Sequence, residues 1–318
     1  MISDNAAAIE ANELNQAIHA LKPEMRRLRL IGGAVVLATV ILCIIATRFV
    51  VLRAAEPFEG VMWSLGIAAF LIIATFTQIR RRHEMLVMPV LARTAGLTYE
   101  KGGRDLIDSL PQRLLPRGRT KVDDALSGLV GGRSIRFGEV KVETGGKHST
   151  TLFDGLVISF PLKSDVPDFF IADEKATKGF LFFVGQIKVD DLVWQRSTSG
   201  HLGQSYSLWA PQSLGDHQDR LVPLLNAIST IERNLDHTSA LYTASCTNRT
   251  IHLAIRHRQN LFKIGGLLSG DEELTSDLRH ALHELHLPLR LVTDLLKAEQ
   301  DYAAKPGAMP TASASATG

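Results

Sequence analysis

The pattern of apolar and polar positions changes along the chain, and its strongest feature is a pair of long apolar runs near the N-terminus. The first run covers residues 30–52 and the second covers residues 61–79. Each approaches the roughly 20 residues that a helix needs to cross a hydrocarbon core of about 30 Å. The link between them, residues 53–60, is too short for a domain and contains Pro57 and Gly60, which break helices. The pattern therefore predicts two transmembrane helices joined as a tight hairpin.

Basic residues cluster on one side of this predicted hairpin. The tip carries only Arg48 and Arg53, whereas the two outer flanks carry Lys22, Arg26, Arg27, Arg29, Arg80, Arg81 and Arg82. Because Lys and Arg beside a span are retained in the cytoplasm, we expect both termini to be cytoplasmic. A cleaved signal peptide is the alternative for the first run. That run is longer than the apolar region of about 7–15 residues in a signal peptide, and a second run follows it at once.

The segments that flank the hairpin also show helical periodicity. Residues 3–21 carry apolar positions at three- and four-residue spacing and predict a short helix, which Pro23 interrupts. Residues 80–96 predict a continuation of the second apolar helix, kinked at Pro89 and ended by Gly96. Residues 98–108 are polar and contain glycine, so they are expected to be a connector.

From residue 134 the apolar period changes to two, which is typical of strands. Ile135 and Phe137 are followed by Val140 and Val142, so the phase slips by one position at Gly138. A β-bulge at this glycine would let both pairs face one core. Residues 151–162 alternate as a second strand, and the two glycines at 145–146 predict an antiparallel hairpin.

The remaining pattern alternates between groups of strands and helices. It predicts strands at 168–172, 179–184, 189–194 and 204–209, a helix at 213–234, strands at 240–246 and 250–256 around the turn 247–249, and a long helix from residue 269. Strands followed by helices without regular βαβ alternation indicate an α+β fold. We expect four parts: an N-terminal cytoplasmic helix (1–29), a two-helix transmembrane hairpin (30–79), a cytoplasmic mixed β-sheet/helix domain (80–302) and a disordered tail (303–318).

Composition agrees with a membrane hairpin attached to a larger water-soluble part. The chain is 45% hydrophobic with a net charge of +2, and its mean hydropathy is +0.07. Its basic excess lies beside the apolar runs, which favours contact with anionic lipid headgroups over a nucleic-acid surface. Cys43 lies in the first apolar run and Cys246 in the soluble part. They are not expected to pair, which is typical of a reducing compartment.

Three motifs suggest chemistry, and each has a simpler interpretation. Residues 145–148 (GGKH) resemble part of a phosphate-binding loop, but they lack its first glycine and its Ser or Thr after the lysine, so a hairpin turn is preferred and no cofactor is predicted. Asp123 and Asp124 are adjacent, and on a helix their side chains would diverge by about 100°. No Gly-x-Ser-x-Gly motif marks a nucleophile.

The third motif is the histidine-rich sequence HALHELH, with His280, His283, Glu284 and His286. A zinc helix of the His-Glu-x-x-His type needs its second histidine one residue later than the spacing found here. The leucine stripe of the same helix places these histidines on its flank. We therefore predict a solvated or interfacial face and no metal site, and the role of the three histidines stays open.

Residues 114–143, followed by 151–159, resemble an uncharacterised bacterial family of two-span membrane proteins (domain of unknown function 3137). The resemblance rests on Asp124 with Gly128, on Glu139 at the end of a strand segment, and on Phe153 with Gly155. It covers roughly residues 30–300. The family has two N-terminal spans before a cytoplasmic domain, so the resemblance implies this topology and implies no activity.

The sequence thus leads to two functional hypotheses. The first is a multi-pass protein of the bacterial inner membrane, in contact with the lipid bilayer, whose cytoplasmic domain is a scaffold or binds an unidentified protein partner. The alternative is a membrane-tethered hydrolase or metal-dependent enzyme, with Asp124, Glu139 and Asp154 as the acidic residues nearest the glycine-rich hairpins. No catalytic residue is assigned, no nucleic-acid partner is expected, and no oligomeric state is selected.

Overall fold

The computed structural model describes residues 2–53, 57–146, 149–173, 192–195, 206–212, 220–235, 239–257 and 271–304. The chain divides into two compact units. The first comprises Met1–Gly96 and Phe262–Leu285, and the second comprises Leu97–Leu261 and His286–Gly318.

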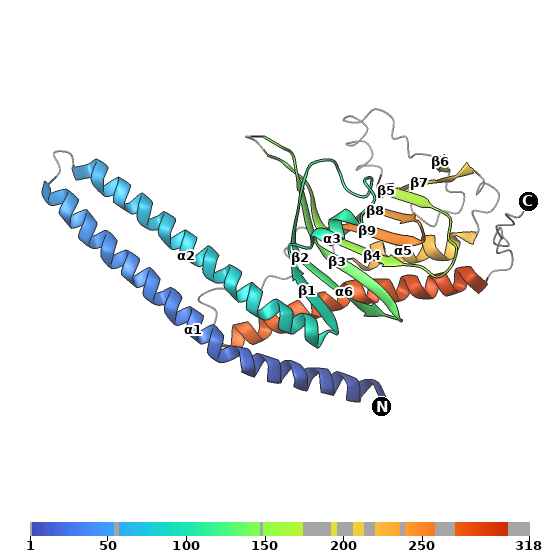
Figure 1. Ribbon diagram of the computed structural model, residues 1–318, viewed down its shortest axis with the longest axis horizontal. Coiled ribbons are helices and arrows are strands. Elements are labelled where there is room, and N and C mark those ends of the chain that lie inside the picture. Colours follow the sequence, from blue (N-terminus) through green and yellow to red (C-terminus); the bar gives the residue numbers. More distant parts are fainter. Residues whose placement is uncertain are drawn as a thin grey trace, which may run out of the picture. The chain divides into compact units, whose positions relative to one another are not determined.

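The first unit contains two long helices, α1 (Ile2–Arg53) and α2 (Pro57–Thr94), which lie side by side (Figure 1). Within the described residues, one helical stretch, Pro23–Phe49, is long and apolar enough to cross a membrane. The apolar part of α2 is shorter there, at Leu65–Ile79. The structure therefore contains one N-terminal apolar helix of spanning length.

The two internal prolines of these helices have similar consequences. The sequence predicted that Pro23 interrupts the first helix, but α1 continues through it. A single proline removes one hydrogen bond and bends a helix, while the bonds on either side hold the helix together. Figure 1 shows α1 changing direction along its length. Helix α2 runs through Pro89 as predicted, and it ends before Gly96, whose φ is 69°.

The second unit is built on an antiparallel sheet, which confirms the α+β class. Its described strands are arranged in the order β1-β2-β3-β4-β9-β8-β5-β7-β6 (Figure 1). Their bounds are β1 Leu97–Lys101, β2 Arg119–Val130, β3 Arg133–Glu143, β4 Thr151–Pro161, β5 Phe169–Asp173, β6 Leu192–Gln195, β7 Tyr206–Pro211, β8 Ser239–Thr247 and β9 Thr250–His257. The second unit also contains the helices α3 (Arg104–Asp108) and α5 (Val222–Asn234). Helix α6 (Asp271–Ala304) belongs to the first unit up to Leu285 and to the second unit from His286.

Several local predictions are confirmed. Strands β3 and β4 form an antiparallel pair, as do β8 and β9. Asn248 and Arg249 connect β8 to β9 with φ of 50° and 57°, as a tight hairpin turn of this length requires.

Some predicted segments lie outside the described residues. They are the strand 179–184, the start of the helix at 213–219, Lys147 and His148 of the GGKH motif, and residues 305–318 of the tail. Ala303 and Ala304 belong to α6 and not to the tail.

Three elements near the start of the second unit were missed. The expected connector at 98–108 contains strand β1 and the short helix α3, and residues 119–130 form the long strand β2. The first half of β2 reads RTKVDD, in which charged residues obscure the alternation typical of a strand.

The predicted bulge at Gly138 is wrong. Strand β3 pairs with β4 without a register shift from Arg136↔Ser159 to Val142↔Phe153. Ile135 and Phe137 therefore lie on one face of the sheet and Val140 and Val142 on the other, yet all four are buried. Val140 and Val142 join a core cluster with Leu114, Phe153, Val157, Tyr242 and Ala254. The apolar positions change phase because one face of β3 is buried at Ile135 and Phe137 and the other face is buried at Val140 and Val142.

A bulge does occur nearby, in the partner strand. Val122 pairs with Val140 and Ala125 pairs with Gly138, so two residues of β2, Asp123 and Asp124, lie opposite the single residue Glu139. The bulge thus brings two carboxylates of β2 beside one of β3.

Candidate functional site

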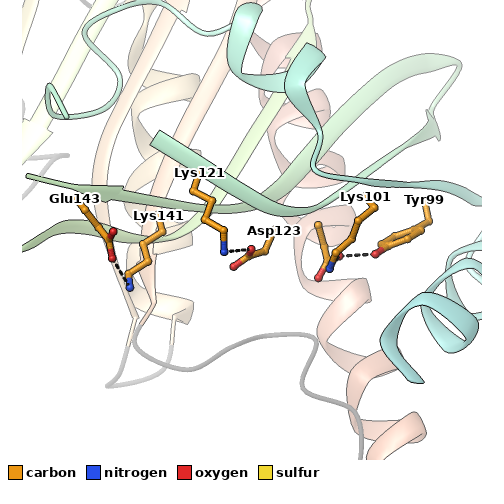
Figure 2. Close-up of polar contacts among 7 residues, drawn as sticks. Tyr99, Lys101, Lys121, Asp123, Lys141 and Glu143 are labelled. Atoms are coloured by element: carbon orange, nitrogen blue, oxygen red, sulfur yellow. Dashed lines mark hydrogen bonds and ion pairs between the residues drawn. The ribbon is translucent and has the colours of Figure 1, made fainter. Parts of the chain in front are cut away.

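The candidate site is a group of polar side chains on one face of the sheet, at the ends of β1, β2 and β3 (Figure 2). We call it the charged face and define it as Tyr99, Lys101, Lys121, Asp123, Asp124, Lys141 and Glu143. The strand register explains why these residues meet. Lys101 lies opposite Asp124, and Lys121 lies opposite Lys141. Residues directly opposite each other in an antiparallel pair project from the same face.

Asp124 is the buried anchor of the charged face. Its Oδ1 accepts a hydrogen bond of 2.5 Å from the hydroxyl of Tyr99 and one of 2.9 Å from Nζ of Lys101. The carboxylate is almost fully buried, whereas the Lys101 side chain reaches solvent. Two hydrogen-bond donors from β1 therefore compensate the desolvation of the Asp124 carboxylate, which lies in the β2 bulge.

Two further ion pairs lie on β2 and β3, each between residues two positions apart. Nζ of Lys121 lies 2.5 Å from Oδ1 of Asp123, and their side chains are 68% and 45% exposed. Nζ of Lys141 lies 2.7 Å from Oε1 of Glu143. The hydrogen bond from Lys141 lowers the pKa of Glu143 and raises that of Lys141. Both pairs are accessible to a binding partner.

The polar row continues across the sheet from β3. Lys141 lies opposite Asp154 of β4. Burial raises the pKa of Asp154, the charge of Lys141 opposes this shift, and the nearby carboxylates of Asp123 and Glu143 add to it. Because Gly155 pairs with Arg256, the next position brings Asp154 beside His257 of β9. Nδ1 of His257 is hydrogen-bonded to the hydroxyl of Ser239 on β8.

The structure brings the three carboxylates considered from sequence onto this same face. Asp124 lies in the β2 bulge, Glu139 lies opposite that bulge, and Asp154 lies one strand further along. They do not converge on one point, because Lys101 binds Asp124 and Lys141 lies opposite Asp154. The arrangement is a row of mixed charge.

Of the other members of the row, the sequence singled out only Asp123, as the neighbour of Asp124, and it placed that pair on no strand. Tyr99 and Lys101, Lys121 and Asp123, and Lys141 and Glu143 are each separated by two positions. This spacing places polar groups on one face of a strand. It would have been informative had β1 and β2 been recognised as strands.

The histidines of α6 lie elsewhere. His280 and His283 are exposed, and Nε2 of His280 lies 3.1 Å from Oε1 of Glu284. No group of three or more His, Cys, Asp or Glu side chains is placed to hold a metal ion among the residues that the structure describes.

The two cysteines are free thiols. Cys246 is buried in β8, and burial raises the pKa of its thiol to about 12. It is therefore protonated at neutral pH, which does not suit a nucleophile.

Comparison with known proteins adds little to this geometry. No family model matches the chain, and no curated protein matches it. Among solved structures, the chain is similar to the crystal structure of the mycobacterial trehalose monomycolate transport factor A, with 10% sequence identity and a TM-score of 0.33. The match covers 63% of this chain and 93% of that one. A likeness at this level carries no argument about fold or activity, and the resemblance to the two-span family stays a prediction.

Proposed function

We propose that this chain is a multi-pass protein of the bacterial inner membrane, with two spans and cytoplasmic termini, whose α+β domain binds a protein partner through the charged face. Anchoring is supported by the apolar surfaces of α1 and α2. Trp63, for example, is 74% exposed, and Phe70 and Ile73 are also largely exposed. Side chains of this size and number are unfavourable in water and favourable in lipid. The resemblance to the two-span family agrees with this topology.

The observation that carries the binding proposal is the mixed charge of the charged face. It presents the cations of Lys101, Lys121 and Lys141 together with the anions of Asp123 and Glu143, and the buried carboxylate of Asp124 holds Lys101 in place. Nucleic-acid surfaces need a clear excess of positive charge. Alternating charges instead suit a protein surface with the complementary pattern, because such a pattern selects a partner and its register.

Site-specific crosslinking in native membranes tests this proposal. A photoreactive amino acid replaces Lys121 in the full chain, and a matched variant carries it at Arg136. Arg136 is also exposed, but it projects from the opposite face of the sheet. Phe137 of β3 lies on the same face as Lys141, and its neighbour Arg136 therefore points the other way. We expect one adduct of defined mass from position 121, weakened by high salt, and none from position 136. Equal adducts from both positions, or none from position 121, would contradict binding through this face.

One observation favours the enzyme alternative as a second candidate. Ser239, His257 and Asp154 lie on neighbouring strands of one face, and serine, histidine and aspartate together serve nucleophilic hydrolysis on many folds. Hydrolysis of p-nitrophenyl acetate and p-nitrophenyl phosphate by the purified full chain, with and without a chelator, tests this candidate. Activity should disappear in Ser239→Ala and persist in Ser127→Ala, which changes a serine on another strand. Activity that survives Ser239→Ala would exclude this serine as the nucleophile.

A further inference from the structure

A cavity that is open to solvent lies on α1, at the N-terminal end of the apolar stretch of that helix. It has a volume of about 610 Å³ and is lined by His19, Pro23, Arg26, Arg27 and Leu30. These residues recur at spacings of mainly three and four positions, which places them on one side of the helix. The cavity therefore combines two guanidinium groups with an apolar end.

The position of the cavity along the helix matches the depth of lipid headgroups. The apolar stretch Pro23–Phe49 has 27 residues, or about 40 Å of helix at 1.5 Å per residue, which is close to a bilayer with its headgroup regions. Residues 30–49 alone cover about 30 Å, the hydrocarbon core. In a membrane, Arg26 and Arg27 would thus lie at the level of the phosphates and Leu30 at the start of the acyl chains.

The chemistry of the lining fits a phosphate diester attached to an apolar tail. Arginine presents several N–H donors in a planar fork that matches phosphate oxygens. Leu30 is 75% exposed, so an acyl chain would cover apolar surface there. Pro23 has no N–H to donate to the carbonyl of His19, four residues earlier, so that carbonyl can accept a hydrogen bond from a headgroup hydroxyl.

We propose that this cavity binds the headgroup of an anionic phospholipid from the bilayer. The proposal rests on the membrane anchoring proposed above and adds a defined lipid site to it. The two guanidinium groups among the lining residues, Arg26 and Arg27, favour an anionic headgroup over a zwitterionic one. An acyl chain beside Leu30 distinguishes a lipid from a soluble phosphate ester.

Lipid titration of the purified full chain tests the site by native mass spectrometry. The protein in a nonionic detergent is titrated with phosphatidylglycerol, with phosphatidylcholine of the same chain length, and with glycerophosphoglycerol, which has the headgroup but no acyl chains. We expect phosphatidylglycerol to bind most tightly. The double variant Arg26→Gln/Arg27→Gln should weaken its binding about 30-fold, because it removes the charge-assisted hydrogen bonds from both guanidinium groups to the phosphate.

A matched control separates a defined site from general attraction. Arg81 and Arg82 of α2 are also exposed and also flank an apolar stretch, so Arg81→Gln/Arg82→Gln removes the same charge outside the cavity. This variant should retain nearly all of the phosphatidylglycerol affinity. Equal weakening by both double variants, or equal affinity for phosphatidylcholine, would overturn the site. Equal affinity for glycerophosphoglycerol would overturn its assignment to a lipid.

Alkaline extraction of native membranes distinguishes failure of this inference from failure of the proposed anchoring. Release of the wild-type chain into the soluble fraction would contradict membrane anchoring itself. Retention in the membrane without any preference for phosphatidylglycerol would contradict only the lipid site. We expect retention of the wild type and of both double variants, since the apolar helices remain intact in all three.

Discussion

Nη2 of Arg133 lies 2.6 Å from Oε2 of Glu299, which joins the first residue of β3 to the last turns of α6. The two side chains are 12% and 2% exposed. Oε1 of Glu299 also accepts hydrogen bonds from the backbone N–H groups of Lys163 and Ser164, at 2.6 and 2.7 Å. One buried carboxylate therefore holds α6 to both the start of β3 and the segment that follows β4.

We predict that Glu299→Gln lowers the free energy of unfolding by about 3 kcal/mol, because it leaves the Arg133 guanidinium buried without its counter-ion. Thermal unfolding of the full chain in detergent, followed by tryptophan fluorescence, measures the loss. Glu143→Gln is the control, since it breaks an ion pair with Lys141 that is partly open to solvent. Its midpoint should stay near that of the wild type. Equal shifts for the two variants would mean that the Glu299 pair does not stabilise α6 on the sheet.

The same carboxylate predicts a pH dependence. Burial alone would raise the pKa of Glu299, but the N–H of Ser164, the Arg133 guanidinium and the N–H of Lys163 together hold it below the ordinary value of 4.5. A lowered pKa in the folded state stabilises the fold fully above the unfolded value, and this stabilisation is lost as the pH falls through the folded value. The stability gap between wild type and Glu299→Gln should be constant near neutral pH and should shrink below pH 4.5. A gap that persists unchanged to pH 3 would contradict this.

The sequence predicted those parts of the fold whose signal is local. The strands around 134–143 and 151–162 and the hairpin at 247–249 were found because alternation and turn residues suffice to mark them. Strand β2 was missed because charged residues obscure the alternation in its first half and its bulge shifts the pattern after Val122. The phase change at Gly138 was visible, but its cause was not. Which face of β3 is buried at each position depends on segments that lie far away in the sequence.

The candidate site shows the same division. Asp124, Glu139 and Asp154 were considered from sequence, and the register of β2, β3 and β4 brings them to one face. The contacts of Asp124 with Tyr99 and Lys101 depend on the pairing of β1 with β2, in which paired residues are more than twenty positions apart in the sequence. No local pattern reports such a register, so the mixed charge of this face emerged only from the fold.

Gly138 provides a third prediction, with a different reason from the one the sequence suggested. A Cβ added at this position would lie 2.5 Å from the carbonyl oxygen of Asp124 and 3.1 Å from Cα of Ala125. Gly138→Ala should therefore cost about 1–3 kcal/mol, because backbone atoms at the bulge must move apart. Gly145→Ala is the control, since a Cβ there meets nothing within 4 Å. Equal unfolding midpoints for the two variants would show that the close backbone approach at Gly138 does not constrain the sheet.

A fourth prediction concerns the folding of the sheet and its helices without α1 and α2. A fragment of residues 97–304 contains all the described strands with α3, α5 and α6, and it should be soluble and unfold cooperatively. Tyr302 is buried, its hydroxyl donates to the carbonyl of Asp165 at 3.1 Å, and the Arg220 guanidinium lies 5.7 Å from the centre of its ring. A fragment that ends at Asp301 should lose about 2–4 kcal/mol, in the range for removal of a large buried side chain.

The matched control for this truncation is a fragment that ends at Tyr302 itself. It restores the ring and its hydrogen bond, and it should unfold at nearly the same denaturant concentration as the fragment that ends at Ala304. If the fragment ending at Asp301 is equally stable, Tyr302 does not hold the end of α6. If even residues 97–304 fail to unfold cooperatively, the sheet and its helices do not fold without α1 and α2.

The last prediction decides between one span and two. The described part of α1 contains a stretch of spanning length, whereas the described apolar stretch of α2 is shorter. If α1 alone crossed the membrane with its basic N-terminal flank in the cytoplasm, the second unit would lie on the opposite side. With two spans, Arg80, Arg81 and Arg82 would return the chain to the cytoplasm. A reporter that is active only outside the cytoplasm should thus be silent after Gly318 and active within residues 54–59. Activity at both positions would show that only α1 crosses, and activity after Gly318 alone would reverse the predicted orientation.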